Sequence, residues 1–221
     1  MPNAIPFSGL ASGVHDFTTT DGKNIEVFYD MDTKDGPWIV IQRRTSDDVV
    51  FHRNWTDYKN GFGDLLGNFW IERLKFHFSV SKGNDNLHLL TTTSMILRVE
   101  LEAWDGTKGY AQYSEFQVAN EAQNYRLSVR GFSGNVSYDA LSFHDGYDFT
   151  SFDRDNDIHE GGNCAQGYHG SWWFSDCFTC NLNGLYVTDN GEVNTTAIIW
   201  RNFPDQMSLA TPLKKSKMMI R

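Results

Sequence analysis

The stretch from Gly131 to Gly191 constrains the fold most, because it is long and shows almost no hydrophobic periodicity. Gly, Asn, Asp, Ser and large aromatic residues dominate it. Regular elements carry an apolar repeat of about 3.6 or about 2 residues, so this stretch predicts ordered loops. Long loops in a globular domain are usually held by a metal, a ligand or a disulfide, and functional residues concentrate in them. We therefore expect the functional site here.

Three carboxylates stand at alternate positions of one segment in this stretch, Asp153-Arg-Asp-Asn-Asp-Ile-His-Glu-Gly-Gly-Asn-Cys164. In an extended loop, alternate spacing points acidic side chains toward a common centre. Concentrated negative charge is unfavourable unless a cation neutralises it, and hard carboxylate oxygens suit Ca²⁺. A solvated acidic turn is the alternative, because Asp and Asn are common turn residues. The spacing alone leaves both interpretations open.

The segment does not fit an EF-hand, whose loop also begins Asp-x-Asp-x-Asp. With Asp153 at the first position, Ile158 falls where the sharp turn needs Gly. Cys164 then falls where a bidentate Glu is needed. No long amphipathic helix precedes or follows the segment. We exclude the EF-hand.

Composition excludes several classes of protein. The 221 residues suffice for one large domain or two small ones with a substantial core. The net charge of −9 argues against a nucleic-acid partner. The densest basic cluster, Lys214, Lys215 and Lys217, is expected on one face of a terminal strand. No apolar run approaches the length of a membrane-spanning helix, so we expect no membrane insertion.

Short apolar runs predict an α+β fold with a mostly antiparallel sheet. Strands are predicted at 24–31, 38–44, 95–101, 125–129, 197–200 and 218–221, and another follows the Asp105-Gly106 turn. Residues 32–36 are expected to join the first two strands as a hairpin. Asn54 is expected to cap a short helix that runs to Tyr58 and is closed by Gly61.

Motifs along nearly the whole chain resemble those of fibrinogen-related domains. They are Gly36-Pro-Trp-Ile-Val-Ile-Gln-Arg-Arg44, Phe51-His-Arg-Asn-Trp-Thr-Asp-Tyr-Lys-Asn-Gly-Phe-Gly63, Gly67-Asn-Phe-Trp70, Leu97-Arg-Val-Glu-Leu-Glu102, Tyr110-Ala111, Phe116, Asp153-Arg-Asp-Asn-Asp157, Asn163-Cys-Ala165, Gly170-Ser-Trp-Trp173, Asn181-Leu-Asn-Gly184 and the terminal Met-Ile-Arg221. They occur in order and span residues 13–221.

The resemblance implies a fibrinogen C-terminal-like fold in a single domain over residues 1–221. A small N-terminal subdomain covers approximately 1–50. A central twisted sheet covers 51–134 plus 197–221, and the last strand returns to it. A loop-rich calcium and ligand region covers 135–196.

The resemblance also favours Ca²⁺ over the plain acidic turn. It implies that Asp155 and Asp157 are side-chain ligands. The backbone carbonyls of His159 and Gly161 would complete the protein ligands, and waters would fill the rest of the shell. Asp153 is then expected to hold the turn without touching the ion.

A disulfide between Cys164 and Cys177, beside the metal, is implied by the same resemblance. Cys180 stands where relatives usually have Ser, so we expect a free, buried thiol. A zinc site of Cys164, His169, Cys177 and Cys180, or a redox pair at Cys177 and Cys180, is an alternative that we disfavour. Tyr29 replaces a cysteine that most relatives have, which removes a second disulfide.

Many relatives are lectins for acetylated groups, and the resemblance implies an acetyl pocket beside the disulfide. The residues expected to line it are Tyr168, Cys177, Phe178, Asn194 and Thr195. Phe178 replaces a usual His, and residues 194–197 replace a usual Tyr-Ala-Asp-Gly, so the pocket is altered. The resemblance also implies a cis peptide bond between Asp176 and Cys177. Trp172 and Trp173 are expected to be buried rather than to bind ligand.

Two functions follow. The first is a calcium-dependent pattern-recognition lectin of innate defence that binds acetylated glycans, or other acetyl or anionic groups, on microbial surfaces. The alternative is a protein-binding module that acts on a receptor or matrix partner, which the altered pocket favours. We reject catalysis, because the chain has no Gly-x-Ser-x-Gly elbow, phosphate loop or His-Glu-x-x-His motif.

The predicted setting is extracellular, as a secreted protein. Asn54, Asn135 and Asn194 are candidate N-glycosylation sites in Asn-x-Ser/Thr sequons. A single shallow sugar site binds weakly, so lectin activity would require several sites, as in a homo-oligomer. It would form through the globular domain, through Cys180 or through a segment outside this chain, and the sequence does not choose among them.

Overall fold

The computed structural model describes residues 10–19, 22, 24–71 and 83–221, and the described part is α+β as predicted. Its strands are β1 Gly13–Thr18, β2 Asn24–Asp30, β3 Trp38–Arg44, β4 Phe62–Gly63, β5 Phe69–Trp70, β6 Met95–Ala103, β7 Lys108–Val118, β8 Leu127–Gly134, β9 Cys180–Asn181, β10 Ile199–Trp200 and β11 Leu213–Ile220. Its helices are α1 Trp55–Asn60, α2 Gly83–Leu90 and α3 Cys164–Gly167, with 3₁₀ turns η1 Glu121–Gln123 and η2 Ser142–His144.

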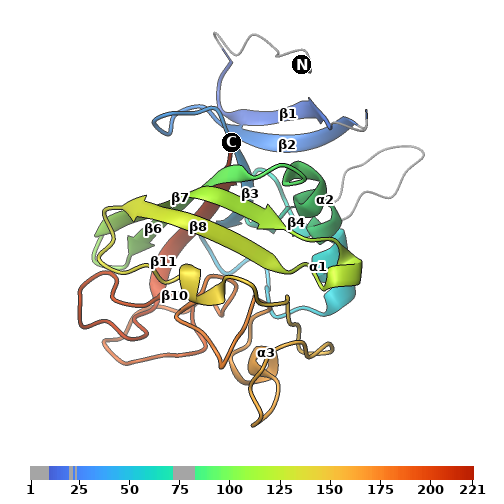
Figure 1. The fold of residues 1–221 in the computed structure, drawn as a ribbon. Coiled ribbons are helices and arrows are strands. Elements are labelled where there is room, and N and C mark those ends of the chain that lie inside the picture. The colour runs from blue at the N-terminus through green and yellow to red at the C-terminus, as the bar shows by residue number, and fades with distance from the viewer. Residues whose placement is uncertain (1–9, 20–21, 23, 72–82) are drawn as a thin grey trace.

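Within the described residues, one large antiparallel sheet has the order β1-β2-β3-β11-β6-β7-β8, and β5 and β4 branch from β3. Figure 1 shows this sheet above a layer of loops that contains α3. The C-terminal strand β11 lies between β3 and β6, which confirms its predicted return to the central sheet. Strand β3, which lies in the predicted N-terminal subdomain, pairs directly with β11 of the predicted central sheet. The hydrogen-bonded sheet therefore crosses the predicted boundary near residue 50.

Strand β6 shows why these residues form a sheet. Leu97, Val99 and Leu101 alternate along it and are buried, whereas the even-numbered side chains face the opposite way. The buried face joins one large core with residues of the loop layer. Trp172 and Trp173 are fully buried in that core, as predicted.

Helix α1 confirms the predicted caps. The side chain of Asn54 accepts a hydrogen bond from the Asp57 backbone N–H at 2.8 Å, and Gly61 closes the helix with φ 75°. Strand β1 and helix α2 were not predicted. Helix α2 packs on α1 so closely that a Cβ at Gly83 would lie 2.4 Å from the carbonyl oxygen of Tyr58.

Two side chains of β3 fasten the loop layer to the sheet. Gln42 donates a hydrogen bond to the carbonyl of Leu182 at 2.9 Å. Arg44, which is 1% exposed, donates to the carbonyl of Gly184 at 2.9 Å and stacks over the Phe51 ring. Backbone groups buried outside regular elements need such partners. No helix among the described residues is long and apolar enough to cross a membrane.

Candidate functional site

Hydrogen bonds hold the segment 153–161, which we call the acidic loop, through the side chains of Asp153 and Asp157. Asp153 accepts from the Trp55 backbone N–H at 2.8 Å and from the Ser151 hydroxyl at 2.7 Å. Asp153 therefore ties the loop to the start of α1, which agrees with the supporting role expected for it. Asp157 accepts from the backbone N–H groups of His159 and Cys164, at 3.0 Å and 2.9 Å.

Asp155 and Asp157 lie close enough to interact electrostatically. Partial burial, together with the charge of Asp155, raises the pKa of Asp157 above its ordinary value, against the effect of its two backbone hydrogen bonds. Asp155 is exposed, and so are the neighbouring His159 and Gly161, whose carbonyls are the other expected ligands. Two mutually repelling carboxylates in an open loop of oxygen donors fit the ligand preference of Ca²⁺.

The described residues do not assemble the disfavoured zinc site. Cys164 and Cys177 form a disulfide, and Cys180 is a free, buried thiol, as predicted. One group of His, Cys, Asp and Glu side chains comes together in the described part of the chain, namely His159, Asp176 and Cys177. Its sulfur belongs to the disulfide, so it offers no thiolate ligand.

Two contacts connect the acidic loop and the adjoining Cys164 to Asp176 and Cys177. The disulfide joins Cys164, which follows the loop, to Cys177. The His159 ring approaches the Asp176 carboxylate at 2.6 Å between Nδ1 and Oδ1. The peptide bond between Asp176 and Cys177 is cis, as the resemblance implied. The acidic loop is therefore joined to Asp176 and Cys177 by one covalent bond and one close side-chain contact.

Cys177 is one of the residues that line a cavity of about 290 Å³. Its lining residues are Tyr168, Cys177, Phe178, Val193, Thr195, Ile199, Leu209 and Ala210. Tyr168 and Phe178 form one wall in an edge-to-face pair with ring centroids 4.7 Å apart. We call this cavity the aromatic pocket.

Four of the five expected lining residues, Tyr168, Cys177, Phe178 and Thr195, line the aromatic pocket. Asn194 does not line it. Its side-chain oxygen accepts hydrogen bonds from the backbone N–H and hydroxyl of Thr196, at 3.1 Å and 2.8 Å, which holds the side chain in its own turn. Sequence reasoning missed the apolar lining residues Val193, Ile199, Leu209 and Ala210.

Comparison with known proteins identifies the domain. The family model for the C-terminal globular domain of fibrinogen beta and gamma chains matches residues 8–221. The chain belongs to this fibrinogen family. Its disulfide and acidic loop therefore occur in a fibrinogen-like globe, as the motifs indicated.

The similar proteins are of several kinds. Human ficolin-3 is 36% identical over 95% of this chain and 66% of its own length. Human fibroleukin is 41% identical over 92% of this chain and 46% of its own length. The chain thus spans about half to two-thirds of these relatives.

Solved structures agree with the assignment. The fibrinogen-like globe of human ANGPTL2 is 32% identical with a TM-score of 0.84, covering 97% of this chain and 94% of that one. Lamprey fibrin D-dimer, complexed with the peptide Gly-His-Arg-Pro-amide, is 28% identical with a TM-score of 0.79, covering 96% of this chain and 70% of that one.

In this fibrinogen-like globe, the buried residue His144 bonds to the backbone that follows Phe178 of the aromatic pocket, and no sequence signal pointed to it. The Nδ1 atom of His144 lies 2.7 Å from the carbonyl oxygen of Trp173, so it donates. Its Nε2 atom then accepts from the backbone N–H groups of Thr179 and Cys180, both at 3.4 Å. Complete burial lowers the pKa of His144 to about 4, although the Trp173 hydrogen bond opposes the shift. The ring is neutral at pH 7 and fixes the backbone just after Phe178.

His144 predicts a stability change with pH. The unfolded chain binds a proton at His144 below about pH 6.5, whereas the folded domain does so only below about pH 4. Stability from this group is complete above about pH 6.5 and falls as the pH drops toward about 4, by about 3 kcal/mol at most. Urea unfolding in chelator should show this loss in the parent and a smaller loss in His144→Gln. An equal pH dependence in both proteins would contradict the role of His144.

Proposed function

We propose that this domain is a secreted, calcium-dependent lectin that binds acetylated groups of glycans on microbial surfaces. The observation that carries the proposal is the aromatic pocket joined to an acidic oxygen-donor loop by the Cys164–Cys177 disulfide and the His159–Asp176 contact. Similarity to ficolin-3 over most of this chain supports it. The domain binds rather than transforms its ligand in this proposal.

The chemistry of the aromatic pocket suits a small acyl group. The Tyr168 and Phe178 rings and the Leu209 side chain surround an acetyl methyl with apolar surface. The acetyl oxygen needs a hydrogen-bond donor. The Thr179 N–H is already bonded to His144, so we expect the N–H groups of Cys177 and Phe178 to supply it.

Ca²⁺ acts indirectly in this proposal. Asp155 and Asp157 bind the ion with the carbonyls of His159 and Gly161, and the ion offsets the repulsion between the two carboxylates. The loop then holds His159 and Cys164 in place, and these residues contact Asp176 and Cys177. The sugar does not need to touch the metal.

Calcium should stabilise the fold through the acidic loop. Extracellular Ca²⁺ sites bind with Kd of about 10⁻⁴–10⁻³ M, so about 10 mM calcium should stabilise the parent by about 1.4–2.7 kcal/mol. Asp155→Ala and Asp157→Ala should lower the Tm in calcium to the value in chelator. Asp16→Ala, which removes an exposed carboxylate from β1, should keep the calcium response. Equal stabilisation of the parent and both loop variants would disprove the calcium site.

Acetyl recognition is tested by retention on an N-acetylated resin in millimolar calcium. Free acetate and chelator should each release the parent. Leu209→Arg places a long charged side chain at the mouth of the aromatic pocket and should abolish retention, since Leu209 is 60% exposed and lines it. Leu66→Arg is the matched control, because Leu66 is 73% exposed and does not line the pocket. Loss of retention in both variants, or in neither, would contradict recognition through this pocket.

Protein binding is the second candidate function, and the rim of the pocket favours it. Val193 and Leu209 are large apolar lining residues that are 69% and 60% exposed. Exposed apolar side chains grouped beside a pocket are common at protein interfaces. Fibroleukin and the ANGPTL2 globe are similar proteins, and the lamprey fibrin structure contains a peptide ligand. A calcium-stabilised parent that the acetylated resin does not retain would support this function over the lectin.

A further inference from the structure

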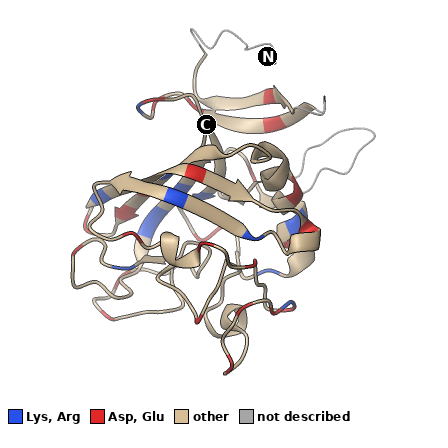
Figure 2. Ribbon diagram, viewed as in Figure 1, with Lys and Arg blue, Asp and Glu red and all other residues tan. Residues whose placement is uncertain are grey.

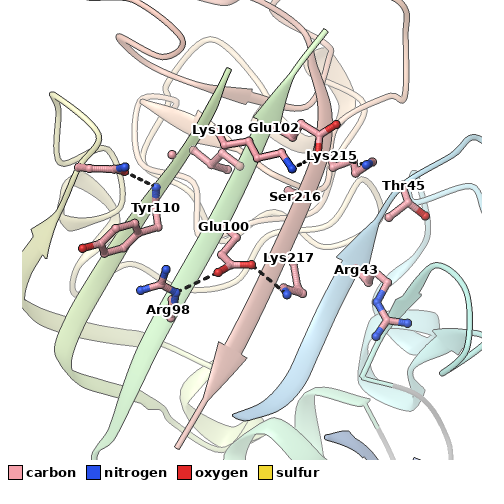
Figure 3. Close-up of a pocket in the computed structure, with 13 residues that line it drawn as sticks. Arg43, Thr45, Arg98, Glu100, Glu102, Lys108, Tyr110, Lys215, Ser216 and Lys217 are labelled. Atoms are coloured by element: carbon pink, nitrogen blue, oxygen red, sulfur yellow. Dashed lines mark hydrogen bonds and ion pairs between the residues drawn. The ribbon is translucent and has the colours of Figure 1, made fainter. Parts of the chain in front are cut away.

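A second cavity lies on the outer face of the central sheet. Its volume is about 450 Å³, and its charged lining comes from β3, β6, β7 and β11 (Figure 3). Arg98, Glu100 and Glu102 of β6 line it, whereas Leu97 and Val99 are buried in the core on the other face. The cavity is therefore separated by the sheet from the core on which the loop layer packs. We call it the basic groove.

Cross-strand register arranges the charges of the basic groove in rows. Glu102 on β6 stands between Lys215 on β11 and Lys108 on β7. One row further, Glu100 stands beside Lys217 of β11, with Tyr110 of β7 on its other side. Directly opposed side chains on one face of a sheet are near neighbours, so each row places its charges in contact. Figure 3 shows these side chains standing on three adjacent strands.

Arg98 and Arg43 extend the rows along the groove. Arg98 contacts Glu100 at 3.1 Å and stacks over the Tyr110 ring at 3.8 Å. Arg43 stacks over the Phe28 ring and donates to the carbonyl of Leu65 at 3.0 Å. Both guanidinium groups are thus held in fixed positions.

Cations outnumber carboxylates in the basic groove. The cationic lining residues are Arg43, Arg98, Lys108, Lys215 and Lys217, and the anionic ones are Glu100 and Glu102. The excess is three positive charges, on a chain whose net charge is −9. Two further charged residues contact the lining: Asp30 pairs with Lys217, and Lys214 pairs with Glu102. Their opposite charges cancel, so the excess stays at three. Figure 2 shows Lys and Arg as well as Asp and Glu on strands of the sheet, and many Asp and Glu in the loop layer.

Glu102 shows how incompletely the cations are neutralised. The ammonium groups of Lys215, Lys108 and Lys214 lie 3.1, 3.7 and 3.9 Å from its carboxylate oxygens. Burial raises the pKa of Glu102, but the hydrogen bond from Lys215 and the three ammonium charges lower it further, so the net shift is downward. One carboxylate shared by three cations leaves them available to another anion. The Lys108 side chain is 75% exposed and open to such a ligand.

We propose that the basic groove binds a linear anionic polysaccharide that carries sulfate or carboxylate groups. The charge excess on an acidic protein provides the electrostatic complementarity. A peptide partner would need apolar pockets for anchoring side chains, whereas Lys, Arg and Glu dominate the lining. The Arg98 guanidinium lies over the Tyr110 ring, which positions a cation in the groove for an anionic group of the polysaccharide.

This site is independent of the aromatic pocket and of calcium. It lies on the other face of β6, and none of its lining residues belongs to the acidic loop or the aromatic pocket. Asn135, one of the candidate glycosylation sites, lines its edge and accepts a hydrogen bond from the Tyr110 N–H at 2.7 Å. A glycan on Asn135 would cover the groove, so the test uses a Ser137→Ala background, which removes that sequon.

The test measures affinity for immobilised heparin, as a probe polyanion, over a range of salt concentrations in chelator. The groove variant is Lys108→Gln with Lys215→Gln. The matched control, Arg126→Gln with Arg201→Gln, removes two positive charges from exposed residues outside the groove. The parent should bind in chelator. The groove variant should bind about tenfold more weakly, with a log–log salt slope smaller by about two, and the control should change less than about twofold.

Four outcomes would overturn the proposal. They are no heparin binding by the parent, equal loss in the groove variant and the control, equal binding of polyglutamate with the same groove dependence, and an unchanged affinity in Lys108→Gln alone. The polyglutamate result would indicate an acidic peptide partner instead. Lys108→Gln guards against misfolding of the double variant, because this side chain is largely exposed and its loss leaves Lys215 and Lys214 on Glu102.

Discussion

The structure depends on satisfying the buried backbone of a long, irregular loop layer. Loops cannot pair their own polar groups as helices and sheets do, so side chains must supply the partners. Arg44 and Gln42 do this from β3 for the segment at 182–184, and His144 does it for the backbone after Phe178. Arg44 is a charged group in the core, which burial disfavours, and its pKa falls to about 10 for that reason. Its stack on Phe51 and its hydrogen bonds to carbonyls offset that cost.

These anchors leave the acidic loop at 153–161 at the surface, attached to the pocket through few contacts. On the inner side of the pocket, Tyr168 and Phe178 pack against the large core cluster that contains the fully buried Trp172 and Trp173. Its outer side rests on Cys177, the disulfide and the His159–Asp176 contact. A site with one fixed and one adjustable wall is suited to control by an ion bound next to the adjustable wall. The calcium dependence that we propose needs only these contacts, and no contact between the ion and the ligand.

The sheet can be predicted from the sequence further than the candidate site can. Alternation of Leu97, Val99 and Leu101 predicts β6 because the apolar repeat is local. The same method shortened β11 to its last residues, since the lysines at 214, 215 and 217 mask the alternation of Ser216 and Met218. Strand β1 and helix α2 were missed because Gly13, His15 and the Gly83-Asn-Asp-Asn86 start give weak periodic signals.

The disulfide and the cis peptide bond at Cys177 could be predicted only from the family resemblance, because neighbouring residues in the sequence determine neither cysteine pairing nor peptide-bond geometry. Residues far apart in the chain complete the pocket, and this is why Leu209 and His144 went unnoticed. Asn194 was predicted to line the pocket and does not. Its neighbours Val193 and Thr195 line it, but the Asn194 side chain bonds Thr196 instead.

The most direct test of the account is hydrogen–deuterium exchange of the backbone amides of Cys177 and Phe178, with millimolar Ca²⁺ and with chelator. If the ion orders the pocket through the acidic loop, calcium should slow exchange at these amides in the parent and leave it unchanged in Asp157→Ala. Amides of the central strand β6 provide the internal reference for global stability. Protection that appears in the acidic loop but stops before Cys177 would contradict the coupling of ion and pocket.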